Sequence, residues 1–235
     1  AVDPSAYDAL PAGLFAEIVY SYDIVDAAGA VTPQTATVTI QGVNDAPVAA
    51  GETLVFEEDG DAVGQNDVLA NDVDPDAGDS LVIATAGGVA AGTAFAVTSL
   101  GGRDGMATVL ANGQVQFDPT GFGDLGVGDT DTVEILYTVT DGDGGFADAT
   151  LTIEVQGQND APTAPNETFA GFEDTAIQGA LGASDPDGDA LAYTLQTAAL
   201  EGNVAIAGDG TLTYTPFANS NFNGTDSFVY VATDP

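Results

Sequence analysis

Several residue types that enzymes need, or that brace small secreted folds, are missing from this sequence. It has no Cys and no His, which excludes disulfides, thiolate metal sites and the usual nucleophile–base pairs. A serine nucleophile would lack its proton acceptor, so only a pair of carboxylates of the glycosidase type is left. Such a pair needs one acid in a cleft, whereas the acids here lie in Gly- and Pro-rich turns. We therefore expect that the protein is not an enzyme.

Positive charge is almost absent as well. Arg103 is the single cation against 37 Asp and Glu, which gives a formal charge of −36 over 235 residues. Nucleic acids and anionic membrane surfaces need basic patches, so both are excluded as partners. Carboxylates repel one another within a Debye length of about 10 Å. Salt or bound metal cations must therefore neutralise them.

The sequence also lacks long apolar runs and helical periodicity. There is no 18-residue apolar run and no basic leader, so we expect no direct membrane insertion and interpret the sequence as an interior piece of a longer chain. Hydrophobic residues still make up 44% of the sequence, which is enough for folded cores. Short β-rich runs separated by Gly and Asp-Gly turns predict an all-β fold of tandem immunoglobulin-like antiparallel sandwiches.

An internal repeat sets the domain organisation. Asn44-Asp45-Ala46-Pro47 recurs 115 positions later as Asn159-Asp160-Ala161-Pro162, each time after an alternating, strand-like run. We predict that residues 1–43 are the C-terminal strands of a preceding repeat, 44–158 a complete repeat, and 159–235 a further repeat lacking its last strand. In the complete repeat the expected strands are 53–56, 80–86, 93–99, 107–110, 114–118, 132–140 and 146–155.

The first 43 residues are expected to hold a strand pair, with arms at 16–25 and 35–42. We align Tyr20 with Tyr137 of the complete repeat by a shift of two residues. In this alignment Ile24 takes the place of the acid Asp141.

The acids gather in clusters that a sandwich would bring to its two ends. These clusters are residues 57–59 and 173–174, residues 72–79 and 185–189, and residues 141–143 with a counterpart at Asp234. Short Asp-x-Asp loops suit Ca²⁺, which takes six to eight oxygen ligands, whereas Mg²⁺ keeps more of its water and Zn²⁺ prefers nitrogen or sulfur. Calcium is the predicted cofactor. The alternative is that Asp-Pro-Asp-Gly is simply good turn chemistry on an acidic surface.

In their order and spacing, these motifs resemble the bacterial cadherin-like repeats, including VCBS-type modules, of large secreted (RTX-type) adhesins and biofilm proteins. The resemblance implies calcium at each junction, shared by the linker and the two domains that it joins. The ligands that it implies are, at the first junction, Asn44, Asp45, Asp74, Asp76 and Asp141, and at the second, Glu58, Asp131, Asn159, Asp160, Asp185, Asp187 and Asp234.

The predicted function is that of a calcium-rigidified stalk segment of a secreted or cell-surface bacterial adhesin or biofilm matrix protein, with neighbouring repeats of the same chain as partners. One alternative is a self-assembling extracellular fibre in which the incomplete end domains exchange strands. Another is a carbohydrate-binding sandwich that uses aromatic side chains, although there is no Trp and alternating aromatics are more often core. The candidate aromatics are Tyr7, Phe122, Tyr214, Phe217 and Phe222.

Overall fold

The structure is a computed structural model that describes residues 3–60, 63–218 and 223–234. Apart from one 3-10 turn, η1 (Pro4–Tyr7), its regular elements are strands. In chain order these are β1 (Phe15–Val25), β2 (Val31–Gln41), β3 (Glu52–Glu57), β4 (Val63–Asp67), β5 (Val82–Ala86), β6 (Val89–Ala90), β7 (Phe95–Thr98), β8 (Asp104–Val109), β9 (Gln114–Asp118), β10 (Thr130–Thr140), β11 (Phe146–Gln156), β12 (Ile177–Ala180), β13 (Ala192–Thr197), β14 (Gly202–Ile206), β15 (Thr211–Pro216) and β16 (Val229–Thr233). The predicted all-β class is confirmed.

The chain divides into two compact units. The first contains residues 1–56, 60–119 and 132–154, and the second contains 57–59, 120–131 and 155–235. The second unit therefore includes short loops from the end of the predicted complete repeat. The repeat boundaries at 43/44 and 158/159 stay predictions.

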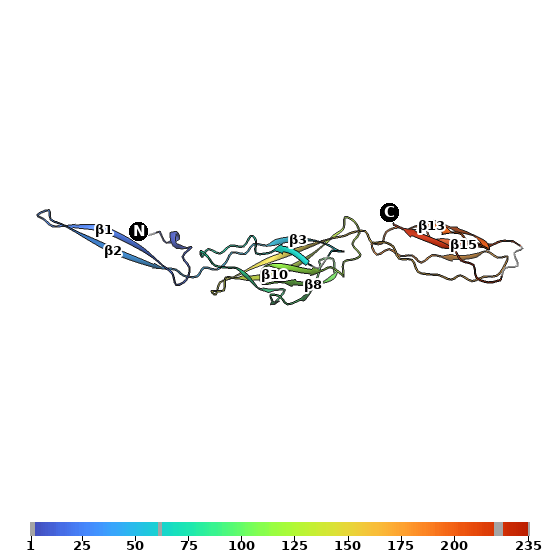
Figure 1. Ribbon diagram of the computed structural model, residues 1–235, viewed down its shortest axis with the longest axis horizontal. Helices are drawn as coiled ribbons and strands as arrows, with labels where there is room; N and C mark the ends of the chain where they lie inside the picture. Colours follow the sequence, from blue (N-terminus) through green and yellow to red (C-terminus); the bar gives the residue numbers. More distant parts are fainter. Residues whose placement is uncertain (1–2, 61–62, 219–222, 235) are drawn as a thin grey trace. The chain divides into compact units, whose positions relative to one another are not determined.

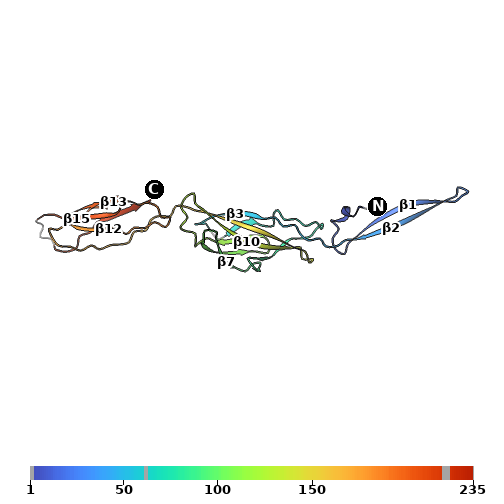
Figure 2. The ribbon, with the colours of Figure 1, turned by 180° about the vertical axis from the view of Figure 1, so that it is seen from behind.

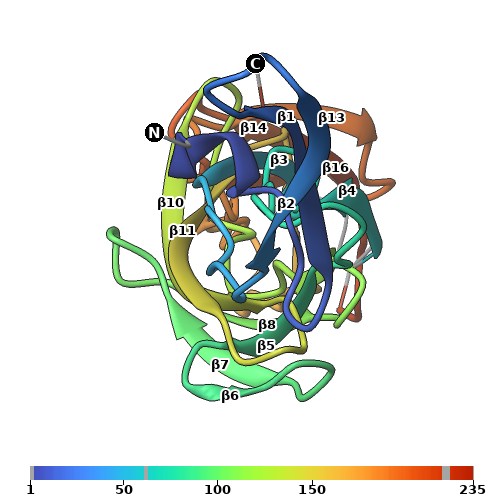
Figure 3. The same cartoon turned by 90° about the vertical axis from the view of Figure 1, so that its left-hand side faces the viewer.

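The first unit is built around a two-sheet sandwich. One sheet has the strand order β3-β11-β10-β5-β6 and the other the order β4-β9-β8-β7. Strands β3, β10 and β8 of this sandwich are labelled in Figure 1, and β7 is labelled in Figure 2. The end-on view shows β10 and β11 running side by side (Figure 3). Alternate residues of β10 are buried, as a strand with one face on a core requires. The rings of Phe56 on β3 and Phe117 on β9 pack edge to face, with their centroids 5.4 Å apart, and this contact joins the two sheets.

The strands β1 and β2 form a separate antiparallel ribbon in the same unit, with Phe15 opposite Gln41 and Val25 opposite Val31. Both strands begin and end 115 positions before β10 and β11. The ribbon is thus the counterpart of the β10–β11 hairpin without any shift. Its apolar side chains are exposed: Tyr22 is 49% exposed, whereas Tyr137, 115 positions later, is 1% exposed.

This register corrects the alignment made from the sequence. Tyr22, not Tyr20, corresponds to Tyr137, and Asp26, not Ile24, corresponds to Asp141. Asp26 also has the same turn contacts, because its Oδ1 accepts the amides of Ala28 and Ala30, both at 2.8 Å. A shift of two residues keeps every side chain on the same face of a strand. Alternation of apolar residues could therefore not detect the error.

The second unit holds the remaining strands, in a three-stranded sheet β12-β15-β14 and a two-stranded sheet β13-β16 (Figure 1, orange and red). Leu181 and Leu212 are buried at 6% and 0% exposure. The side chain of Asp226 braces this unit: it accepts the amides of Leu200 and Glu201 and the hydroxyl of Tyr214.

The strands expected in the complete repeat are present, with ends that differ by up to three residues. Two strands were not expected, β4 (Val63–Asp67) and β6 (Val89–Ala90). The residues of β4 (VGQND) carry little apolar alternation, and β6 has only two residues, so neither leaves a periodic signal. Among the described residues no helix is long and apolar enough to cross a bilayer.

Candidate metal centres

Two linker residues, Asn-Asp, make the same set of hydrogen bonds at both places where they occur. At the first, the Asn44 amide group donates to Asp141 Oδ2 at 2.9 Å, and the backbone amide of Asp45 donates to Asp76 Oδ2 at 2.8 Å. At the second, Asn159 donates to Asp234 Oδ2 at 2.9 Å, and the amide of Asp160 donates to Asp187 Oδ2 at 2.8 Å. The linker motif therefore organises carboxylates that are distant in sequence.

The Asp-Pro-Asp loops are also built alike. In the first, Asp74 Oδ1 accepts the amide of Asp76 at 2.8 Å. In the second, Asp185 Oδ1 accepts the amides of Asp187 at 3.0 Å and Asp189 at 3.2 Å. These are Asx turns, for which Asp is suited. Each turn leaves the other oxygen of its first Asp, Asp74 Oδ2 and Asp185 Oδ2, buried without a hydrogen-bond partner.

Around the first linker, Asp74, Asp76 and Asp79 bring carboxylate oxygens within 4.8 Å of one another. Asp76 is only 2% exposed, and its Oδ1 has no hydrogen-bond partner. Burial raises the pKa of Asp79, and the negative charges of Asp143, Asp74, Asp76 and Asp141 raise it further. Like charges held this close, with buried oxygens that no donor satisfies, need a positive partner.

Asp141 closes this centre from the turn after β10. Its Oδ1 accepts the amides of Asp143, Gly144 and Gly145, and its Oδ2 accepts Asn44. The Asn44 hydrogen bond is the largest influence on the pKa of Asp141, and with the turn amides it holds that pKa below its usual range despite burial. This carboxylate is therefore fixed in position and ionised.

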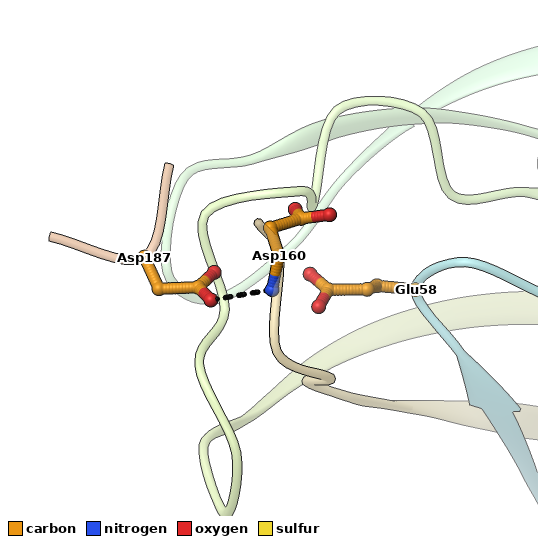
Figure 4. Close-up of side chains that lie close together, drawn as sticks. All are labelled: Glu58, Asp160 and Asp187. Carbon is orange, nitrogen blue, oxygen red and sulfur yellow. Dashed lines mark hydrogen bonds between the residues drawn. The ribbon is translucent and has the colours of Figure 1, made fainter. Parts of the chain in front are cut away.

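The second centre combines three parts of the second unit. Glu58 comes from the turn after β3, Asp160 from the linker and Asp187 from the Asp-Pro-Asp loop, and their carboxylate oxygens lie within 4.8 Å of one another. Figure 4 shows Glu58 and Asp187 directed at Asp160 from opposite sides. Asp187 also belongs to a second group, with Asp185 and Asp189, of the same spacing. It is thus shared by two sets of carboxylates.

Glu58 is held deep in the second centre, at 5% exposure. Its Oε1 accepts the amide of Gln158 at 2.6 Å and its Oε2 the amide of Leu125 at 3.3 Å. Burial raises the pKa of Glu58, the two amides oppose this, and the charges of Asp160 and Asp187 add to the rise. The pKa of Asp160 is likewise raised, by burial first and then by Asp59, Asp187 and Asp185.

The donor set suits a hard cation. Unpartnered buried oxygens remain on residues of both centres: Asn44 Oδ1, Asp74 Oδ2, Asp76 Oδ1, Asp185 Oδ2 and Asp187 Oδ1. All are carboxylate or amide oxygens, and no nitrogen or sulfur ligand accompanies them in the described groups. Calcium prefers such all-oxygen sites, whereas zinc does not. The residues present therefore fit Ca²⁺.

Most of the residues named from the sequence are brought together. Asp74 and Asp76 share one group, Glu58, Asp160 and Asp187 another, and Asp185 joins Asp187. Asn44, Asn159, Asp141 and Asp234 meet in linker hydrogen bonds, and Asp45 contributes its backbone amide. Asp131 differs: it is buried, at 6% exposure, but it is in none of the carboxylate groups formed by the described residues.

Other acids of the centres were not named as ligands from the sequence. Asp79 and Asp189 belong to carboxylate groups, and the charge of Asp143 acts on Asp79. The final Asp of each DPDxGD-like loop was a visible signal for the first two. Gln158 also contributes, because its side chain donates to Glu57 Oε2 and its backbone amide donates to Glu58. No sequence signal pointed to it, since it is 101 and 100 positions away from these two residues.

The aromatic residues considered for sugar binding are in varied environments. Phe122 is fully buried at 0% exposure, so it is a core residue, as alternating aromatics more often are, and not an exposed sugar contact. The Tyr214 hydroxyl donates to Asp226 Oδ2, while Phe217 is 44% exposed. Tyr7 is part-buried. Phe222 lies outside the described residues.

Comparison with known families matches most of the chain. Residues 44–157 match the model of the bacterial cadherin-like domain, and residues 159–235 match that of the bacterial Ig domain. The first match begins at Asn44 and the second at Asn159, the linker residues of the two centres.

One curated relative is the calcium-binding lectin RapA2 of Rhizobium johnstonii, 35% identical over 141 residues, which are 58% of this chain and 58% of that lectin. Solved structures that resemble the chain include mouse cadherin-23 EC22-24, at 18% identity and a TM-score of 0.48, covering 99% of this chain and 71% of that one. Another is the human desmocollin-1 ectodomain, at 16% identity and a TM-score of 0.45, covering 93% and 41%.

Proposed function

We propose that this chain is a stalk segment of a secreted or cell-surface bacterial adhesin or biofilm matrix protein, and that calcium rigidifies it. Residues 44–157 match the bacterial cadherin-like domain and residues 159–235 the bacterial Ig domain. Two kinds of observation support the proposal. The matched domain families and the calcium-binding relative agree with a calcium-dependent adhesin segment. The geometry of the two acidic centres supplies the chemistry.

The observation that carries the proposal is the repeated hydrogen-bond arrangement. Asp45 and Asp160 each donate a backbone amide, at 2.8 Å, to the second Asp of an Asp-Pro-Asp loop. In both loops that second Asp, Asp76 or Asp187, keeps one buried oxygen without a partner. A turn that only needed good local chemistry would not leave the same oxygen unsatisfied in two sequences. A cation bound at each centre would satisfy both.

Calcium would act on the linker through charge. Without it, the gathered carboxylates repel one another, and the segments that carry them are expected to separate. With it, the linker residues and the loops share one ligand. Pro47 and Pro162 limit the linker further, since each fixes its own φ and restricts the alanine before it to extended conformations. The proposed ligands are Asn44, Asp45, Asp74, Asp76, Asp79 and Asp141 at the first centre, and Glu58, Asn159, Asp160, Asp185, Asp187, Asp189 and Asp234 at the second.

An extracellular location follows from this mechanism. Extracellular calcium modules bind with dissociation constants of about 10⁻⁴ to 10⁻³ M, which match calcium outside the cell rather than cytosolic calcium. The segment would then be flexible before export and stiff after it. Neighbouring repeats of the same chain are the proposed partners.

Small-angle scattering tests this proposal. The chain is measured in millimolar calcium, in EDTA, and in NaCl or Mg²⁺ at matched ionic strength. We expect a narrower distribution of conformations in calcium than in the other three solutions. Asp76→Asn and Asp187→Asn should reduce the effect, whereas Asp23→Asn, which removes an equal charge from the exposed β1 strand, should not. Scattering curves that are the same in calcium and in EDTA would refute a calcium-stiffened stalk.

We further propose that the segment is not catalytic. The family descriptions name domains rather than enzymes. The carboxylates of the two centres are oriented by backbone amides and by the linker, as ligands are, and no His or Cys is present in the sequence.

Carbohydrate binding is a second candidate function, favoured by the lectin relative. It is compatible with the stalk role, because one segment can stiffen through its junctions and bind a sugar on its flank. A microarray of bacterial and plant glycans, probed with the labelled chain in calcium, tests it. Signals no higher than those of a labelled acidic control protein would remove this candidate.

A further inference from the structure

The two repeats have matching turns that can be compared atom by atom. In the first unit, the amide of Val68 donates to Gly113 O at 3.0 Å, and Leu110 donates to Gln114 O at 2.8 Å. In the second unit, Leu181 donates to Gly210 O at 2.9 Å, and Ala207 donates to Thr211 O at 2.8 Å. Gly113 and Gly210 both have positive φ, 84° and 78°. The turn at 207–211 is therefore the counterpart of the turn at 110–114.

One hydrogen bond differs between these counterparts. The amide of Ile83, at the start of β5, donates to Ala111 O at 3.0 Å and closes that strand onto the turn. The corresponding residues are Tyr193 on β13 and Gly208, and they form no such bond in the part of the second unit that the structure describes. Instead, both line a cavity of about 400 Å³. This cavity is a shallow hollow that is open to solvent.

The cavity is lined by the groups that hold a hydroxyl-rich ligand. Asp209 offers a carboxylate, Ser184 offers a hydroxyl, and Tyr193 offers part of an aromatic ring. Asp185 and Asp189, which also line the cavity, are proposed calcium ligands of the second centre. Carboxylates accept hydrogen bonds from ligand hydroxyls, and an aromatic ring packs against the C–H groups between them.

The two most specific groups are held in place. Asp209 Oδ1 accepts the amide of Thr211 at 3.0 Å, and this bond together with the Thr211 side chain keeps the pKa of Asp209 below its usual range. The Tyr193 ring lies against Gly210, where an added Cβ would come within 3.0 Å of the ring, and its centroid is 6.3 Å from that of Tyr230. A preformed acceptor and a fixed ring reduce the ordering cost of binding.

The corresponding positions of the first unit hold only part of this chemistry. Asp74 and Asp79 correspond to Asp185 and Asp189, but the other three groups differ. Val73 corresponds to Ser184, Ile83 to Tyr193, and Asn112 to Asp209. Ile83 is buried at 2% exposure and belongs to the core. The cavity is therefore a local feature of residues 159–235 and not a consequence of the shared fold.

We propose that this cavity binds a saccharide, with a hydroxyl donating to Asp209 and with a ring face against Tyr193. The proposal rests on the second proposed function, carbohydrate binding, and assigns it to a site.

Saturation-transfer NMR with the whole chain in calcium tests the site. The probes are glucose, galactose, mannose, N-acetylglucosamine, cellobiose and lactose. The variants Tyr193→Ile and Asp209→Asn carry the residues of the first unit and are expected to fold. Tyr22→Ile and Asp23→Asn are the matched controls, since both residues are exposed on β1. We expect at least one probe to bind, with about tenfold weaker affinity in Tyr193→Ile, a clear loss in Asp209→Asn, and no change in the controls.

Two outcomes would overturn the assignment, and they are distinguishable. If a probe binds but both cavity variants bind it as the wild type does, the cavity is not the site, and carbohydrate binding as a function survives. If no probe binds and the glycan microarray is also blank, both the cavity and the second function fall. Neither result affects the scattering test of the calcium-stiffened stalk.

Discussion

The substitution Asp187→Asn should change stability in opposite directions with and without calcium. Asp187 is shared by the group with Glu58 and Asp160 and by the group with Asp185 and Asp189. Its Oδ2 accepts the amide of Asp160, a hydrogen bond that an asparagine oxygen can still accept. The variant therefore removes one negative charge while keeping the linker contact.

The magnitude follows from the spacing of the carboxylates. Their oxygens lie within 4.8 Å of one another. At that separation two unit charges repel by about 0.9 kcal/mol in bulk water and by about 3.5 kcal/mol at an effective dielectric constant of about 20. Asp187 is part-exposed, so screening keeps the effect in the lower part of this range. In EDTA at low salt the variant should be more stable than the wild type by about 1–2 kcal/mol, or a few degrees in Tm.

Calcium should reverse this order. At about a hundred times its dissociation constant, one ion stabilises the folded form by about 2.7 kcal/mol. The variant has lost a charged ligand, so calcium should increase its stability much less than that of the wild type. Thermal unfolding followed by circular dichroism, in EDTA and in calcium, measures both differences, with Asp23→Asn as the charge-matched control. If Asp187→Asn were less stable than the wild type by the same amount in both solutions, Asp187 would be a structural residue and not a metal ligand.

Further predictions concern residues outside the charge argument. Burial raises the pKa of Tyr137 to about 12, so the stability of the fold should decrease as pH rises from about 10 to 12. Chemical denaturation should show this decrease in the wild type and not in Tyr137→Phe. The variant itself should be about 1 kcal/mol less stable, because it loses the hydrogen bond to Ala50 O. Burial acts to raise the pKa of Asp226, but the amides of Leu200 and Glu201 and the Tyr214 hydroxyl outweigh it and lower that pKa. The ionised Asp226 should therefore stabilise the fold above about pH 4, and this stabilisation should be lost as pH falls through the lowered pKa. Asp226→Asn should remove this acid dependence of the unfolding free energy. Gly145→Ala places a Cβ 2.0 Å from Asp141 Oδ2 and 2.9 Å from Ala46 Cα, so calorimetric titration should find weaker calcium binding at the first centre; unchanged heats would contradict the arrangement described for it. A stalk segment should also stay monomeric in calcium, whereas a mass that grows with concentration in analytical ultracentrifugation would favour the strand-exchange fibre.

Local patterns in the sequence were sufficient for the secondary structure and for the placing of the acids. Strand β9 was predicted at its exact bounds, because Gln114 to Asp118 alternates cleanly between Gly-containing turns. The acidic loops were identified for a similar reason, since Asp-Pro-Asp-Gly determines its own turn. The alignment of the first residues failed at Tyr22 and Asp26, because alternation has a period of two and a shift of two residues leaves it unchanged.

Composition, the 115-residue repeat and the Asn-Asp-Ala-Pro linkers by themselves determined an all-β, acidic, repeating chain with oxygen-rich loops. The tertiary structure decided which of those oxygens meet. Glu58 accepts a hydrogen bond from the amide of Gln158, which is 100 positions away. Asp131 is also buried, but it belongs to none of the carboxylate groups formed by the described residues. The cavity beside Tyr193 also depends on the fold, since it opens where one backbone hydrogen bond of the other repeat is not made. Such contacts depend on how distant strands pack and register, and no local pattern of residues encodes that.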